Sequence, residues 1–76
     1  MSKLTIISSK EMVALLKRLG FEEIRQTGSH KLFSHRQNDR NTIIPMHSKD
    51  LKRGLIKAIL KDIGISDEEY EALRKN

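Results

Sequence analysis

The chain has 76 residues, a net charge of +5 at neutral pH and no cysteine. A chain of this length forms one domain with a thin core and no deep cofactor pocket, and the lack of cysteine excludes disulfides, thiolate metal sites and a cysteine nucleophile. The basic charge favours nucleic acid, an acidic membrane surface or an acidic protein as the partner, while the lack of a signal peptide and of any apolar run near roughly 20 residues favours a cytoplasmic protein without a membrane span.

The first predicted element is a helix that begins after Ser8. Ser8 and Glu11 have the spacing of a capping box, in which each side chain satisfies a free amide of the first turn. Gly20 can adopt the left-handed conformation that ends a helix. Between these signals the apolar residues recur with helical spacing along one face: Met12, Leu15, Leu16 and Leu19.

Three strands are predicted next, with bounds 21–27, 30–36 and 42–44. Phe21 and Ile24 are the expected apolar contacts of the first strand. Residues 28–29 can form a tight connection between the first two strands, and the polar residues 37–41 are typical of a turn. Pro45 has no amide hydrogen for a sheet ladder, so we expect it to end the third strand.

Two further helices complete the chain. Ser48 or Asp50 can cap the first of them, and Gly64 ends it. Ser66 and Glu69 form a second capping box, which starts a short last helix. The longer helix has an apolar stripe, Leu51, Leu55, Ile56, Ile59, Leu60 and Ile63, and a basic row on another face, Lys49, Arg53, Lys57 and Lys61.

The predicted order is therefore helix, three antiparallel strands, helix and short helix. Both long helices have one apolar face, and packing both against one face of the sheet buries these surfaces together. The α-β-β-β-α order is that of the double-stranded-RNA-binding-domain fold. We predict an α+β protein of this class with an additional C-terminal helix, although a fold does not by itself fix a function.

The candidate chemistry lies around His30. Histidine both accepts and donates a proton near neutral pH. Metal-independent RNA cleavage needs proton transfer at the ribose 2′-hydroxyl and at the leaving 5′-oxygen, with positive charge near the phosphate. In a regular strand the side chains of His30 and the core residue Phe33 point to opposite faces, so His30 points to the open face of the sheet. The amides of Gly28 and Ser29 can bind a phosphate oxygen, and the nearest cations in the sequence are Lys31, Lys49, Lys52 and Arg53.

These residues also have structural interpretations. His30 can be an ordinary strand residue bonded to nearby backbone, Gly28 a turn residue, and the basic row a solvated helix face. His35 and His47 are alternatives for a second proton-transfer group, and His47 is also a candidate substrate contact because it precedes the basic helix. The histidines lack the helical spacing of a metal-binding pair and have no well-placed carboxylate beside them, so we expect no metal or cofactor.

The chain resembles the HicA family, the toxin half of bacterial and archaeal HicA–HicB toxin–antitoxin systems. The resemblance covers roughly residues 9–65 and depends on four motifs taken in order. They are Leu19-Gly20-Phe21, Arg25-Gln26-x-Gly28-Ser29-His30-x-x-Phe33, Ile44-Pro45-x-His47, and Gly54-Leu55-x-x-x-Ile59-Leu60-Lys61 with Gly64-Ile65 behind it.

The resemblance implies a ribosome-independent mRNA interferase, with His30 as the single catalytic histidine and Gly28 as the glycine that adjoins it. It also implies a HicB antitoxin, which blocks the active site and commonly carries the DNA-binding domain, so this chain is not expected to bind DNA directly. Residues 3–7 and 66–76 extend beyond the family core. The last helix can pack on the domain, contact the antitoxin or modify substrate access.

Two other functions fit the same residues. A non-catalytic RNA-binding module would use the same basic surface and would not need His30, although residues 50–53 match only partly the Lys-rich helix start typical of such modules. A protein-interaction domain would bind an acidic partner through its positive face and would show no affinity for nucleic acid at moderate salt.

Overall fold

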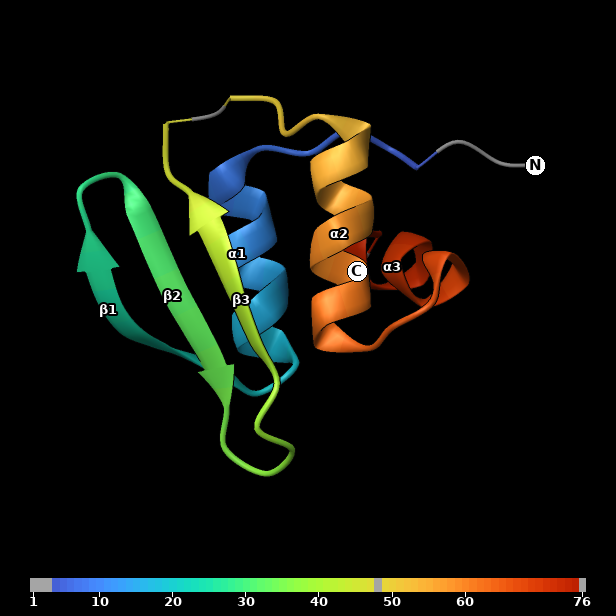
Figure 1. The fold of residues 1–76 in the computed structure, drawn as a ribbon. Coiled ribbons are helices and arrows are strands. Elements are labelled where there is room, and N and C mark those ends of the chain that lie inside the picture. Colours follow the sequence, from blue (N-terminus) through green and yellow to red (C-terminus); the bar gives the residue numbers. More distant parts are fainter. Residues whose placement is uncertain (1–3, 48, 76) are drawn as a thin grey trace.

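The structure is a computed structural model that describes residues 4–47 and 49–75. Figure 1 shows a three-stranded antiparallel sheet with helices on one side, so the predicted α+β fold and its element order are confirmed. None of the helices in this part of the chain is long and apolar enough to cross a membrane. The elements are α1 (Ser9–Arg18), β1 (Phe21–Thr27), β2 (His30–His35), β3 (Asn41–Pro45), α2 (Arg53–Ile63) and α3 (Asp67–Arg74).

The core lies between the sheet and the helices. Side chains alternate across a strand, and Phe33 of β2 and Ile44 of β3 turn inward with no exposed surface. They meet the apolar faces of α1 and α2. Tyr70 of α3 is also fully buried in this core. The helix residues of the core are Met12, Leu15, Leu16, Ile56, Ile59, Leu60, Ile63 and Tyr70.

Strand β2 is central, with β1 and β3 antiparallel on either side. Thr27 pairs with His30, so residues 28–29 form a two-residue hairpin turn as predicted. On the other side His30 pairs with Pro45. The hairpin turn and the end of β3 therefore lie at the same end of the sheet, which is the upper end in Figure 1.

The prediction that Ile24 makes an apolar contact is wrong, because 55% of this residue is exposed. The pairing of β1 with β2 shifts between Glu23 and Arg25, which makes Ile24 the extra residue of a β-bulge. A bulge interrupts the alternation of inward and outward side chains. The side chain of Ile24 consequently lies outside the core.

The ends of β2 and β3 differ by one residue from the prediction. β2 ends at His35, and β3 runs from Asn41 to Pro45, so Pro45 is the last residue of the strand. Its carbonyl accepts a hydrogen bond from the Ser9 hydroxyl of α1. This contact joins the end of β3 to the start of α1.

The predicted start of the second long helix is wrong. α2 begins at Arg53, and its N-cap is Lys52, which makes no side-chain capping bond. Asp50 is therefore not the cap, and Ser48 lies outside the described residues. The amide of Leu51 donates to a carbonyl far away in the sequence rather than taking part in a helix (2.9 Å to Ile7 O). Leu51 is still buried in the core, but it precedes the helix.

The other helix signals are confirmed. Both capping boxes are formed, Ser8 with Glu11 and Ser66 with Glu69. Gly20 and Gly64 have φ angles of +96° and +78°, the left-handed region that glycine adopts at helix ends.

Candidate active site

His30 is the first residue of the central strand, and its side chain is exposed on the face opposite the buried Phe33. Among the described residues, the imidazole of His30 has no hydrogen-bond or ion-pair partner, so no neighbouring backbone group holds it. An exposed and unbonded imidazole is available to a ligand that approaches the open face of the sheet.

The hairpin turn beside His30 offers backbone donors. In the described part of the chain, the amides of Gly28 and Ser29 have no hydrogen-bond partner, whereas the carbonyl of Ser29 accepts from Met46 N (2.6 Å). Gly28 has a φ of +60°, and nothing lies within 4 Å of where a Cβ would stand. Two adjacent amides in such a turn can bind an anionic oxygen.

An open groove lies next to this turn. It has a volume of about 570 Å³ and joins the start of α1 to the residues that follow β3. Met46, which lines the groove, is bonded to Ser29, so this residue connects the groove to the hairpin turn. Its lining residues are Ser8, Ser9, Lys10, Met46, His47 and Lys49.

The groove brings together two predicted site residues and one that the sequence analysis missed. His47 and Lys49 are exposed there, as is Lys10. Lys10 lies in the first turn of α1, where the helix macrodipole disfavours a cation. This unfavourable placement was the only local signal that could have marked Lys10 as functional.

His47, the second histidine of this region, lies close to His30 because the two strands are paired. Pro45 pairs with His30, and His47 follows Pro45 by two residues. Paired residues in an antiparallel sheet lie roughly 5 Å apart and two residues span at most ~7 Å, so the two Cα atoms are within about 12 Å.

Lys31 is separated from this group. It lies on the helix-facing side of β2, opposite to His30, and its ammonium forms an ion pair with Glu23 (3.2 Å). The structure therefore does not bring Lys31 onto the face of His30.

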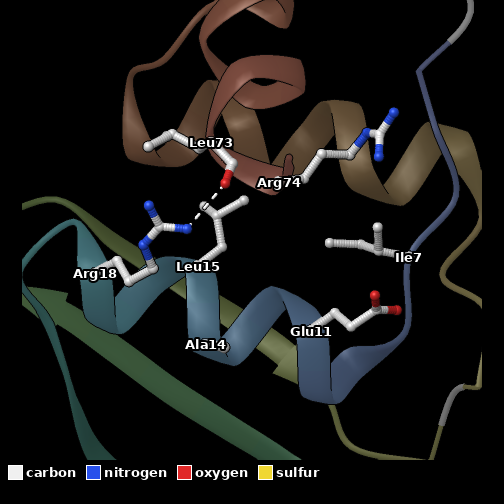
Figure 2. Close-up of a pocket in the computed structure, with 7 residues that line it drawn as sticks. All are labelled: Ile7, Glu11, Ala14, Leu15, Arg18, Leu73 and Arg74. Carbon is white, nitrogen blue, oxygen red and sulfur yellow. Dashed lines mark hydrogen bonds between the residues drawn. The ribbon is translucent and has the colours of Figure 1, made fainter. Parts of the chain in front are cut away.

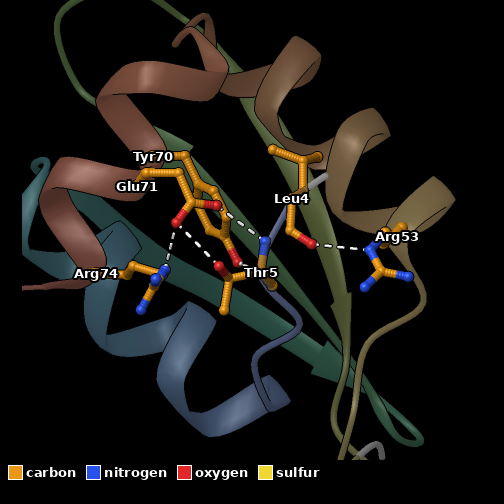
Figure 3. Close-up of polar contacts among 6 residues, drawn as sticks. All are labelled: Leu4, Thr5, Arg53, Tyr70, Glu71 and Arg74. Atoms are coloured by element: carbon orange, nitrogen blue, oxygen red, sulfur yellow. Dashed lines mark hydrogen bonds and ion pairs between the residues drawn. The ribbon is translucent and has the colours of Figure 1, made fainter. Parts of the chain in front are cut away.

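The start of α2 contributes two exposed cations. Lys52 has no ion-pair partner among the described residues. Arg53 donates from Nε to the carbonyl of Leu4 (2.9 Å). Figure 3 shows that the two terminal nitrogens of Arg53 point away from Leu4. They keep their hydrogen-bonding capacity for another ligand.

His35 lies at the other end of β2 and has a structural role. Its Nδ1 accepts from the amide of Gln37 (3.1 Å), and its Nε2 lies 3.1 Å from the carbonyl of Leu19. This pattern requires a neutral ring with its proton on Nε2. The ring also meets Phe21 edge to face, with centroids 5.0 Å apart. His35 is therefore not placed to act with His30.

The same geometry offers no cluster of metal ligands. Within residues 4–47 and 49–75, no three side chains of His, Asp or Glu lie close enough together to hold a metal ion. The groups that the region offers are the imidazole of His30, the amides of the turn, and the cations of the groove and of the start of α2. Such a set can move protons and bind a polyanion.

The chain matches one protein-family model over residues 9–65, about three quarters of its length. The model describes the HicA toxin of bacterial toxin–antitoxin systems. The matched range contains His30, the hairpin turn, the residues after β3 and α2, and leaves out residues 4–8 and α3. No curated protein matches the chain.

Proposed function

Because the chain belongs to the HicA family of bacterial toxin–antitoxin toxins, we propose that it is an endoribonuclease that cleaves mRNA without the ribosome. The observation that supports this most strongly is His30, an exposed and unbonded imidazole beside a turn with two unpaired amides. His30 and Gly28 are also the residues that the family resemblance assigns to the active site.

In the proposed reaction His30 takes the proton of a ribose 2′-hydroxyl. The 2′-oxygen then attacks the adjacent phosphorus, and the bond from phosphorus to the 5′-oxygen breaks. The leaving oxygen takes a proton either from His30 or from His47, which lies in the neighbouring groove. General acid–base catalysis of this kind contributes roughly 10²- to 10⁴-fold to the rate.

The phosphate needs stabilisation as negative charge builds on its oxygens. The amides of Gly28 and Ser29 are the proposed donors next to His30, since neither has a partner in the described structure. Lys49, Lys52 and the terminal nitrogens of Arg53 provide the positive charge along the neighbouring segment. Charge placed where the transition state becomes anionic lowers the barrier to reaction.

The family implies a HicB antitoxin as partner. We propose that it covers the end of the sheet that carries His30 and thereby competes with RNA for the same cations. A binding assay with the inactive His30→Ala protein tests this overlap: the antitoxin is expected to displace labelled RNA. A complex that holds both RNA and antitoxin would contradict it.

The function itself is tested by RNA cleavage with purified wild-type and His30→Ala proteins in excess EDTA. We expect the substitution to lower kcat/KM at least about 100-fold, with RNA affinity and the circular dichroism spectrum unchanged. His35→Gln, checked for folding by the same spectrum, serves as a second histidine variant, because His35 lies at the far end of β2. Cleavage at the wild-type rate by a folded His30→Ala protein would refute the mechanism. RNA binding without cleavage by either protein would favour a non-catalytic RNA-binding module.

A further inference from the structure

The two segments outside the family match are bonded to each other. All three polar groups of Thr5 are bound by α3 (Figure 3). The Thr5 amide and hydroxyl donate to the two carboxylate oxygens of Glu71, both at 2.9 Å, and the Tyr70 hydroxyl donates to the Thr5 carbonyl. We call residues 4–8 and 66–75 together the terminal clamp.

Helix α3 is itself anchored to the rest of the molecule. Tyr70 is fully buried, and this burial raises its pKa to about 12. Arg18 of α1 donates to the carbonyl of Leu73 (2.9 Å) across a small pocket between the two helices (Figure 2). Arg74 also donates to the carboxylate of Glu71 that Thr5 binds (2.7 Å). Helix α3 therefore provides an anchored support for Thr5.

From Thr5 the clamp reaches the start of α2. The carbonyl of Leu4 accepts from Arg53 Nε, and the carbonyl of Ile7 accepts from the Leu51 amide, both at 2.9 Å. Leu4 and Ile7 are also buried, at 7% and 6% exposure. A backbone bond from Leu51, a side-chain bond from Arg53 and two buried side chains thus hold the start of α2 and the residue two before it against the N-terminal segment.

The segment between β3 and α2 is consequently tied at both ends. At its first end, the amide of Met46 is bonded to Ser29 beside His30. At its second end, the clamp holds Leu51 and Arg53. The exposed cations Lys49 and Lys52 lie between these two attachments.

We propose that the terminal clamp positions Lys49, Lys52 and Arg53 for the phosphates of RNA, which makes Tyr70 and Glu71 positioning residues. The inference rests on the proposed function. A side chain that is already ordered gives up less freedom when it binds, so loosening the clamp weakens RNA binding without any direct contact between α3 and RNA. The expected loss is about 3- to 10-fold in Kd.

The test compares Glu71→Gln with Glu68→Gln, both in the inactive His30→Ala background so that the RNA stays intact. Glu68 is exposed on the same helix, and among the described residues it has no bonded partner. Both substitutions remove one negative charge from the same helix, so the change in net charge is the same. Only Glu71→Gln disturbs the bonds to Thr5. Hydrogen exchange at the Leu51 amide reports whether the clamp still holds the start of α2 through the bond to Ile7. RNA titration reports the affinity.

We expect Glu71→Gln to speed exchange at Leu51 and to raise the Kd for RNA about 3- to 10-fold, while Glu68→Gln changes neither. Adding Arg53→Ala should reduce the Glu71→Gln effect on Kd, because Arg53 is one of the three cations that the clamp positions. The chain has one tyrosine and no tryptophan, so tyrosine emission reports whether α3 stays docked. Thr5→Val, which removes only the hydroxyl bond, is the milder variant if Glu71→Gln unfolds.

Unchanged exchange at Leu51 in Glu71→Gln would show that the clamp does not hold this segment, whether or not the protein binds RNA. Faster exchange with unchanged RNA affinity would overturn the positioning role. Failure of the protein with an intact clamp to bind RNA would instead refute the proposed function and with it the RNA part of this inference, while exchange at Leu51 would still decide whether the clamp holds the segment.

Discussion

The three histidines occupy different environments within one small protein. His30 is exposed and unbonded among the described residues, and His47 lines a groove beside it. His35 is bonded at both ring nitrogens. The bonding of His35 depends on Leu19, 16 residues away, which pattern analysis of the sequence does not reveal. The sequence therefore left His35 open as a catalytic alternative, whereas in the structure its bonded ring at the far end of β2 is not placed to act with His30.

Two glycines differ in what surrounds them, although both have positive φ angles. A Cβ on Gly28 would meet open space, whereas a Cβ on Gly20 would lie 3.0 Å from His35 Nε2. We expect Gly28→Ala to lower the free energy of unfolding by about 1–2 kcal/mol, the penalty for a left-handed alanine. Gly20→Ala should lower it further because the methyl group crowds His35. Urea denaturation followed by circular dichroism measures both losses.

His35→Ala provides the control for the glycine pair. In the His35→Ala background, the loss of unfolding free energy caused by Gly20→Ala should approach the loss caused by Gly28→Ala. Equal losses for the two glycine variants in the wild-type background would show that the contact with His35 has no energetic weight.

At the scale of helices, the two capping boxes and the missing cap of α2 have different origins. Ser8 with Glu11 and Ser66 with Glu69 interact over three residues, so their sequence spacing predicts them. Just before the start of α2, the amide of Leu51 is instead bonded to Ile7, 44 residues away in the sequence. Local sequence signals cannot reveal such a bond, which explains why the first helix start was predicted and this one was not.

Two of these helices should make stability sensitive to acid. A backbone hydrogen bond from Ser8 holds the pKa of Glu11 below its ordinary 4.5, and a backbone bond from Thr5, then the bond from Arg74, do the same for Glu71. A pKa that is lower in the folded state stabilises the protein above the unfolded pKa and loses this contribution as pH falls through the folded value. The free energy of unfolding should therefore fall below about pH 4.5.

Urea denaturation of the wild type and of Glu11→Gln, Glu71→Gln and Glu68→Gln between pH 3 and pH 7 checks this expectation. The first two variants should show a smaller fall in acid than the wild type, and Glu68→Gln should follow the wild type. The same acid sensitivity in all four proteins would contradict the assignment of these carboxylates.

At the scale of the whole molecule, the candidate site combines parts that are local in the sequence with parts that are not. The hairpin turn at residues 28–29 and the exposure of His30 follow from strand alternation and turn composition, so both were predictable. Lys10 lines the groove next to Ser9, which bonds to Pro45, 36 residues away in the sequence. Lys31 lies away from His30 because of the same alternation that exposes His30.

The distribution of charge predicts how RNA binding depends on salt. Each cation that contacts a phosphate of single-stranded RNA adds roughly 0.7 to the slope of log Kd against log salt. Lys49→Ala and Lys52→Ala should each reduce this slope by about that amount. Lys17→Ala is the control, because Lys17 is exposed in the last turn of α1, away from the groove. Titrations of His30→Ala protein at several salt concentrations measure the slopes, and equal slopes for all three variants would remove Lys49 and Lys52 from the interface.

The terminal clamp also sets an order of events during synthesis. The partners of Thr5, Tyr70 and Glu71, are translated 65 and 66 residues after it. The segment before α2 is therefore complete before its support exists. The residues of β1, β2 and β3 are all translated before α3, yet the chain acquires its ordered cations only when α3 has been made. Closure of the clamp is thus a late folding step, and a truncated chain that lacks α3 would retain His30 without the ordered surface beside it.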